Sequence, residues 1–210
     1  MANFIDEIID DIDWRVAELA TIKSIPSKYN FNENHKKVHI KYSVPAVYAL
    51  WEGFVKSSFT CYLTHLSKLN LKREDISLNL LTHYIDTYCK LHNPRQNFDT
   101  KKRVVQELDL LFVNQINLVT EVPTESNVNY KVLTNLLNRF CIDTVDSKYE
   151  KGLDRLLFFR NKIAHGENAL KVEIKDITDF IKLVEDLMLD IVINIQDCES
   201  KATYKKPVLV

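Results

Sequence analysis

A seven-residue segment, Arg160 to Gly166, carries the side chains with the clearest chemical potential. It reads Arg-Asn-Lys-Ile-Ala-His-Gly and ends a stretch of apolar residues at helical spacing. In a helix, Asn161 and His165 lie four residues apart and share one face. Arg160 would lie about 140° from His165 around the helix axis. The two side chains therefore cannot simply stack, although a long arginine at a helix end can swing toward the same pocket.

These residue types fit the cleavage of a phosphodiester bond. Histidine titrates near neutrality, so His165 could take a proton from a ribose 2′-hydroxyl or give one to the leaving 5′-oxygen. Arg160 offers a permanent planar fork of donors for a pentavalent phosphate, and Asn161 could position a phosphate oxygen or hold the imidazole tautomer. One histidine per chain leaves the acid or the base unassigned, and a two-fold dimer could supply it. The pattern alone also fits a plain helix end with an exposed arginine, a capping asparagine and a histidine that favours the negative dipole.

The overall charge argues against a protein that grips long nucleic acids over its whole surface, so any nucleic-acid chemistry must use a local patch or a basic partner protein. The chain has 28 lysines and arginines against 29 aspartates and glutamates, for a formal net charge of -1. A local basic excess does surround the segment, from Lys151, Arg155, Arg160 and Lys162 against Asp154. Arg155 and Lys162 are therefore candidates to contact an RNA backbone, although solvated basic residues would give the same pattern.

Cysteine and histidine spacing predicts neither a disulfide framework nor a metal site. The cysteines are widely spaced and include no C-x-x-C pair: Cys61, Cys89, Cys141 and Cys198. His35 and His39 lie four residues apart, but their surroundings are predicted to be a loop that lacks further ligands. We expect no metal and no cofactor. The acidic N-terminal segment and the absence of a 20-residue apolar run predict a cytoplasmic protein with no membrane partner.

Helical spacing of apolar residues dominates the chain and predicts an all-α protein. The predicted helices cover residues 3–22, 44–69, 77–90, 99–114, 130–140, 147–165 and 176–198. The chain has only 3 glycines and 5 prolines, too few turn residues for a β-sandwich or barrel. We predict a single domain over residues 1–210, with a helical insertion or lid at 70–145 and a loose tail at 199–210.

The helix predicted at 44–69 is apolar on nearly all sides, which places it at the centre of the protein. Pro45 suits its first turn, and Gly53 in its middle indicates close packing against a neighbour. The preceding segment, residues 24–41, is polar and irregular. We predict a loop there, with a short strand at Val38–Ile40. Gly166 follows the helix at 147–165, where a glycine commonly ends a helix.

Three segments resemble the HEPN superfamily. Arg160–Gly166 resembles the R-x4-6-H motif of HEPN domains, including the polar residue after the arginine. Ala46–Lys56, with its Trp-Glu-Gly-Phe stretch, resembles the second core helix of the MAE-type and RiboL-PSP-type HEPN proteins. Asn129–Leu133 is similar to the segment that precedes the motif helix in that group.

The resemblance implies an all-α up-and-down helical bundle that dimerises through the motif helices. It also implies a composite cleft that cleaves RNA without a metal and leaves a 2′,3′-cyclic phosphate. Such proteins are often toxins or effectors in prokaryotic defence and toxin–antitoxin systems, with a cognate antitoxin or defence partner. Carried over by position, Arg160 and His165 are catalytic and Asn161 supports them. Glu52 either contacts the motif and its substrate from the second helix or caps a structural hydrogen bond.

The resemblance leaves a second function open. Some HEPN modules are non-catalytic and bind RNA, a nucleotide or a partner protein such as a nucleotidyltransferase or an NTPase. Some HEPN toxins are silenced by nucleotide transfer onto a tyrosine close to the motif. No tyrosine follows His165 at short range, and Tyr204 is the downstream candidate.

Overall fold

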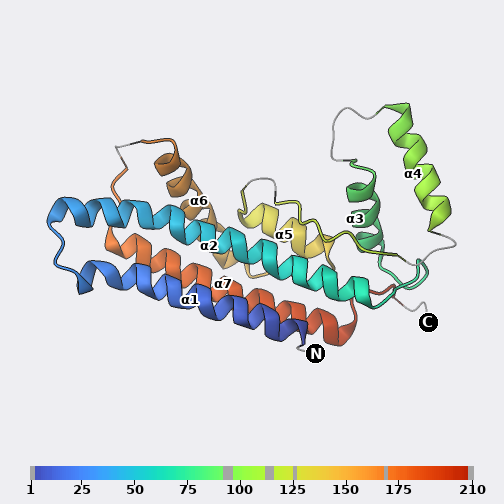
Figure 1. Cartoon of the computed structure of the whole chain (residues 1–210), viewed down its shortest axis with the longest axis horizontal. Helices are drawn as coiled ribbons and strands as arrows, with labels where there is room; N and C mark the ends of the chain where they lie inside the picture. Colours follow the sequence, from blue (N-terminus) through green and yellow to red (C-terminus); the bar gives the residue numbers. More distant parts are fainter. Residues whose placement is uncertain (1–2, 92–96, 112–115, 125–126, 168–169, 208–210) are drawn as a thin grey trace.

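The computed structural model describes residues 3–91, 97–111, 116–124, 127–167 and 170–207 (Figure 1). Within these ranges the chain forms seven α-helices, one 3-10 turn and no β-strand. The elements are, in order, α1 Phe4–Lys28, α2 Glu33–Lys68, α3 Leu78–Tyr88, α4 Phe98–Leu110, α5 Tyr130–Arg139, η1 Ser147–Tyr149, α6 Glu150–Ala164 and α7 Ile174–Lys201. None of these helices is long and apolar enough to cross a membrane, as far as the described ranges go. The prediction of an all-α fold is confirmed.

Three long helices, α1, α2 and α7, lie side by side and form the body of the bundle (Figure 1). α2 runs antiparallel to α1, and α7 returns parallel to α2. α2 also packs against α6, and α5 packs against α3 and α6. Because it has neighbours on several sides, α2 buries residues around most of its circumference, including Trp51, Phe54 and Phe59. The prediction that this helix is central is confirmed.

Asparagine side chains fix where four of the helices begin. Each accepts a hydrogen bond from a backbone N–H of the first turn, which would otherwise lack a partner. These caps are Asn3 on α1, Asn32 on α2, Asn97 on α4 and Asn129 on α5. The cap at Asn129 explains why the Asn129–Leu133 segment marks the start of α5.

The predicted loop at residues 24–41 is wrong. α1 continues to Lys28 and α2 already begins at Glu33, so only a four-residue connection, residues 29–32, separates them. No strand forms at Val38–Ile40, which lies inside α2. The segment is polar because much of it is exposed, and Ile40 alone of that predicted strand is buried. Tertiary packing of the adjoining apolar turns therefore overrides the irregular local pattern.

Pro45 lies inside α2 rather than in its first turn. A proline removes one hydrogen bond of the helix ladder, and nearby side chains reinforce this turn. The Ser43 hydroxyl donates to the His39 carbonyl at 2.8 Å. His39 Nε2 lies 3.3 Å from the Ile22 carbonyl oxygen and links α2 to α1. These bonds hold the turn before the proline and join it to α1.

The remaining helices match their predictions to within a few residues. α3, α5 and α7 differ from the predicted bounds by at most three residues at each end. α4 ends at Leu110, and residues 112–114 of its predicted range lie outside the described residues. In Figure 1, α3 and α4 stand at one end of the bundle.

The segment after α7 is more ordered than the predicted loose tail, as far as Lys206. α7 itself runs on to Lys201, and Tyr204 is buried. The Tyr204 carbonyl accepts the N–H of Ser77 at 2.9 Å, and Lys206 N–H donates to Asp75 O at 2.8 Å. These bonds fasten the segment to the start of α3. Residues 208–210 lie outside the described residues.

Gly53 makes room for a buried arginine from α1. A Cβ atom on Gly53 would lie 2.8 Å from Arg15 Nη1, so a side chain there would force the guanidinium to shift. The guanidinium is fixed there because Nη1 donates to Leu50 O at 2.9 Å and Nε to Asp11 Oδ2 at 3.0 Å. The close neighbour predicted from Gly53 is therefore the Arg15 side chain.

We expect Gly53→Ala to destabilise the protein by about 1–2 kcal/mol. Alanine gains about 1 kcal/mol of helix propensity, but it displaces Arg15 from charge-assisted bonds worth about 1.5–3 kcal/mol each. Gly152→Ala is the matched control, because a Cβ there would meet the ends of the Leu183 side chain at 3.0 Å, and a leucine can change rotamer. Urea unfolding, followed by circular dichroism, measures the free energy of unfolding of both variants. Equal stability of the two variants would contradict the role assigned to Gly53.

Candidate functional site

The end of α6 places the predicted motif at a defined helix terminus. α6 ends at Ala164 and His165 is its C-cap residue. Gly166 follows with a φ of 76°, and its N–H donates to Ile163 O at 3.0 Å. A glycine tolerates this left-handed conformation and ends the helix. The predicted role of Gly166 is confirmed, and it leaves His165 in the last, exposed turn.

Arg160 is held in one orientation by three contacts. Its Nη1 donates to Asn161 Oδ1 at 2.8 Å and to Asn127 Oδ1 at 3.0 Å. Its guanidinium carbon lies 4.7 Å from the centroid of the Tyr48 ring, which adds a cation–π interaction. Both hydrogen bonds use Nη1. The Nε and Nη2 donors thus make no hydrogen bond to the described residues and remain for an anionic ligand.

The partner residue Asn127 is itself fixed by the central helix. The next residue, Val128, donates its N–H to the Tyr48 hydroxyl at 2.7 Å. Trp51 Nε1 donates to the Val128 carbonyl at 3.0 Å, and both aromatic side chains are fully buried. The Trp-Glu-Gly-Phe helix thus acts on the motif through the backbone of Val128. We refer to this arrangement of Tyr48, Trp51 and Val128 as the Val128 clamp.

Tyr48 remains a neutral phenol beside the arginine. Burial raises the pKa of Tyr48 above its ordinary value, and the charge of Glu52 acts in the same direction. The hydrogen bond from Val128 and the charge of Arg160 oppose this shift without cancelling it. An uncharged ring keeps the cation–π contact with Arg160 and forms no ion pair that would neutralise it.

Asn161 and His165 do not act on one another in this structure. Asn161 Oδ1 accepts from Arg160, so Asn161 orients the arginine rather than the imidazole. His165 is exposed, and no side chain in the described part of the chain hydrogen-bonds its imidazole. The structure therefore joins Arg160 to Asn161 and leaves His165 free at the end of the same helix.

The two other basic residues predicted near the motif already have partners. Lys162 Nζ lies 2.8 Å from Glu167 Oε1. Arg155 forms an ion pair with Asp176 at the start of α7, and its guanidinium lies 5.1 Å from the Phe159 ring centroid. Arg155 therefore joins α6 to α7 through its Nη2 atom, and its contact with a substrate stays a prediction.

Glu52 lies on α2 one turn after Tyr48, with its side chain 17% exposed. Its Oε1 accepts from Lys56 Nζ at 2.9 Å. It makes no hydrogen bond to the motif among the described residues, although its charge is felt at Tyr48. Of the two roles predicted for Glu52, the structure provides a structural partner, Lys56.

Tyr204 is a poor acceptor for a transferred nucleotide in this state. Its side chain is only 5% exposed, and it packs where the end of the chain joins α3. His35 and His39 do share a helix, contrary to the prediction, because α2 begins at Glu33. Among the described residues, no group of three histidine, cysteine or acidic side chains is arranged to hold a metal ion.

The helical bundle and the motif at the end of α6 together define a HEPN-type domain. A model of the MAE_28990-like HEPN family matches residues 4–204, which is nearly the whole chain. The chain belongs to this family, and the resemblance seen in its sequence is confirmed. No curated protein and no solved structure matches it. HEPN domains are often ribonucleases, and others are nucleotide-binding modules.

Proposed function

We propose that this protein is a metal-independent endoribonuclease. The observation that carries the proposal is the fixed guanidinium of Arg160, whose Nε and Nη2 groups remain available while Nη1 is bound to Asn127 and Asn161. A planar fork of this kind stabilises the charge that develops on a phosphate during transfer. Its position one turn from an exposed histidine is consistent with RNA as the substrate.

In the proposed reaction the ribose 2′-oxygen attacks the adjacent phosphorus. The P–O5′ bond breaks, a 2′,3′-cyclic phosphate forms, and the 2′-hydroxyl proton is passed on while the leaving oxygen gains one. His165 performs one of the two proton transfers, since an imidazole can act as a general acid or a general base. Arg160 binds the non-bridging oxygens throughout. Each chain offers one such histidine at its motif.

A homodimer through the motif helices would supply the second proton-transfer group. In a two-fold dimer the same surface of each chain meets its copy, so two His165 residues can face one cleft. We propose this dimer as the active form, and a role as a toxin or effector of a prokaryotic defence or toxin–antitoxin system. Light scattering after size-exclusion chromatography tests the dimer, and expression in bacteria tests toxicity.

The test of the activity is incubation of the purified protein with total RNA in the presence and absence of EDTA. We expect fragments with 2′,3′-cyclic phosphate ends, formed equally with EDTA. Protein with His165→Ala, purified in parallel, controls for contaminating nucleases. Fragments of equal amount from both preparations would refute the proposal.

A non-catalytic HEPN module is the second candidate. The observation that favours it is the absence of a hydrogen bond between the Arg160 and His165 side chains among the described residues. A module of this kind would bind RNA, a nucleotide or a partner protein with the same arginine. Binding of RNA without fragments, in the wild-type protein, would support it.

We expect Asn127→Ala to slow cleavage about tenfold, because Arg160 loses the partner that orients it, and misplacement of a catalytic group by a small distance has effects of this order or larger. The loss should appear in kcat more than in KM, since Arg160 would still reach the phosphate. Asn194→Ala is the matched control, because it also removes a side-chain amide that makes one hydrogen bond, here a donation from Nδ2 to the Asp143 carbonyl, but on α7. Equal rates for the two variants would contradict the positioning role of Asn127.

A further inference from the structure

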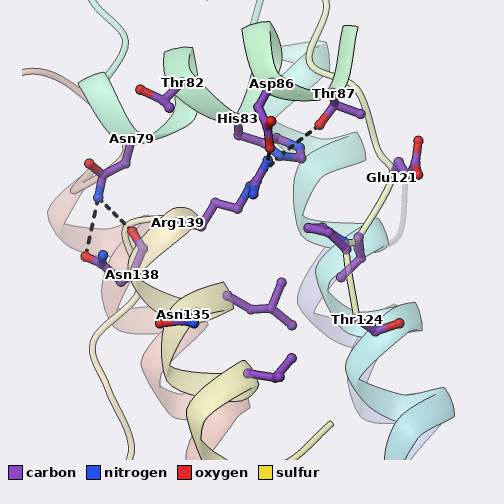
Figure 2. Close-up of a pocket in the computed structure, with 14 residues that line it drawn as sticks. Asn79, Thr82, His83, Asp86, Thr87, Glu121, Thr124, Asn135, Asn138 and Arg139 are labelled. Atoms are coloured by element: carbon purple, nitrogen blue, oxygen red, sulfur yellow. Dashed lines mark hydrogen bonds and ion pairs between the residues drawn. The ribbon is translucent and has the colours of Figure 1, made fainter. Parts of the chain in front are cut away.

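A polar cavity of about 790 Å³ lies outside the motif, between α3, α5 and residues 121–124 (Figure 2). Its volume is within the range of small-molecule sites. Amide side chains from two helices line it, Asn79 from α3 and Asn135 and Asn138 from α5. Apolar side chains, including Val122 and Leu136, form part of the wall.

A hydrogen-bonded group fixes one side of the cavity. Arg139 Nε donates to His83 Nδ1 at 2.9 Å, and Arg139 also forms an ion pair with Asp86 (Figure 2). His83 is fully buried, and its Nε2 lies 2.9 Å from Val119 O, so Nε2 carries the proton. Burial, with a smaller contribution from Arg139, lowers the pKa of His83, and the imidazole is neutral. Hydrogen bonds therefore hold His83, Asp86 and Arg139 together on this side of the cavity.

The charge of the cavity excludes a phosphate as its ligand. Arg139 contributes one positive charge, Asp86 and Glu121 contribute one negative charge each, and His83 is neutral. The excess of one negative charge repels anions. Asparagine amides offer both donors and acceptors, and the carboxylates of Asp86 and Glu121 only accept. A neutral ligand with amino groups matches this wall best.

The cavity lies close along the chain to the proposed catalytic arginine. Thr124 lines it, and the Thr124 carbonyl accepts the N–H of Asn127 at 3.1 Å. Three residues span at most about 11 Å. Asn127 is the residue that orients Arg160. A single RNA strand with one phosphate at Arg160 could therefore extend a nearby base toward the cavity.

We propose that this cavity binds an unpaired base with an exocyclic amino group, such as adenine or cytosine, from the RNA strand that the motif cleaves. The proposal rests on the proposed ribonuclease function. Carboxylates accept from the N4 amino group of cytosine, and asparagine forms a pair of bonds with adenine. Uracil has no amino group to donate. The cavity would thus give the enzyme a base preference that the motif alone does not provide.

Fluorescence anisotropy with labelled eight-nucleotide oligo-A, oligo-C and oligo-U tests the proposal, with His165→Ala present in every protein so that RNA stays intact. We expect oligo-A or oligo-C to bind about fivefold or more tightly than oligo-U. Asn135→Phe fills the cavity from α5 and should remove this preference. Thr82→Phe, which enters from α3, should do the same. Gln196→Ala removes an exposed amide on α7, and this control variant should keep the base preference.

Equal affinity for the three oligonucleotides, or a preference that survives in both phenylalanine variants with unchanged circular dichroism, would overturn the proposal. Titration with adenosine and cytidine distinguishes the source of the base. Nucleosides that bind while the oligonucleotides show no preference would make this a site for a free nucleoside and refute the RNA strand. The assay is independent of cleavage. A protein that never cleaves RNA can still show the base preference, and an active ribonuclease can lack it.

Discussion

Protein carrying Arg160→Ala is expected to cleave RNA about 100- to 1,000-fold more slowly than the wild type, the loss typical of removing one donor to transition-state charge. The substitution removes the whole fork that Asn127 and Asn161 hold in place. The effect should appear in kcat, because the developing charge exists only in the transition state. Single-turnover cleavage of a labelled RNA gives the rate directly.

Arg160→Lys separates charge from geometry. Lysine keeps the positive charge, but it cannot donate to two asparagines and still present a planar pair of donors to a phosphate. We expect it to recover only a small part of the lost rate. Arg103→Ala on α4 is the matched control, since it removes an exposed arginine whose Nη2 lies 3.5 Å from a backbone carbonyl, Tyr88 O. A fully active Arg160→Ala protein would exclude the proposed mechanism.

Combining Arg160→Ala with His165→Ala tests whether the two residues act in one reaction. Groups that act as a unit give losses that do not add, so the double variant should be about as slow as the slower single variant. Additive losses would indicate two separate sites. This comparison matters because no hydrogen bond joins the two side chains among the described residues, so they must converge on the substrate.

The sequence predicted the local features well, because they depend on nearby residues. The helix at the motif, the end at Gly166 and the central helix around Trp51 follow from spacing and composition alone. The loop predicted at 24–41 was wrong because its local pattern is polar, whereas the packing of α2 against α1 decides its structure. Sequence reasoning also missed Asn127, which lies 33 residues from Arg160. No local pattern marks such a partner.

The two residues predicted to contact RNA beside the motif show a similar limit of prediction from sequence. Arg155 and Lys162 were expected to face RNA because they are basic and close in sequence. The structure pairs them with Asp176 and Glu167, one of which lies on the next helix. A charge on a helix can be counted from sequence, but its partner depends on which element packs beside it. The cavity beside His83 was missed too, since its wall combines α3, α5 and residues 121–124.

The largest expected effect on stability follows from the Val128 clamp. Trp51→Ala removes a fully buried ring and leaves the Val128 carbonyl without its donor. Truncating a buried aromatic side chain costs about 3–5 kcal/mol. For a chain of this size that corresponds to a fall in Tm of roughly 6–20 °C. Differential scanning calorimetry measures it.

Trp51→Phe distinguishes the hydrogen bond from the packing. Phenylalanine keeps most of the buried apolar surface but cannot donate to Val128, and an unsatisfied buried carbonyl costs about 1–3 kcal/mol. The other tryptophan, Trp14, is 47% exposed and bonds to Asp11 through the same nitrogen at 2.9 Å, so Trp14→Phe is the matched control. We expect Trp14→Phe to change the free energy of unfolding by less than about 0.5 kcal/mol.

The clamp also connects this stability to the proposed activity. Below its Tm, the Trp51→Phe protein should be folded, yet Val128 would be held by Tyr48 alone and Asn127 would orient Arg160 less firmly. We therefore expect slower RNA cleavage by folded Trp51→Phe protein, with Trp14→Phe unaffected. A Trp51→Phe protein that is destabilised but cleaves at the wild-type rate would show that the clamp supports the core only. In that case Arg160 would be oriented by Asn161 and the Tyr48 ring without help from Val128.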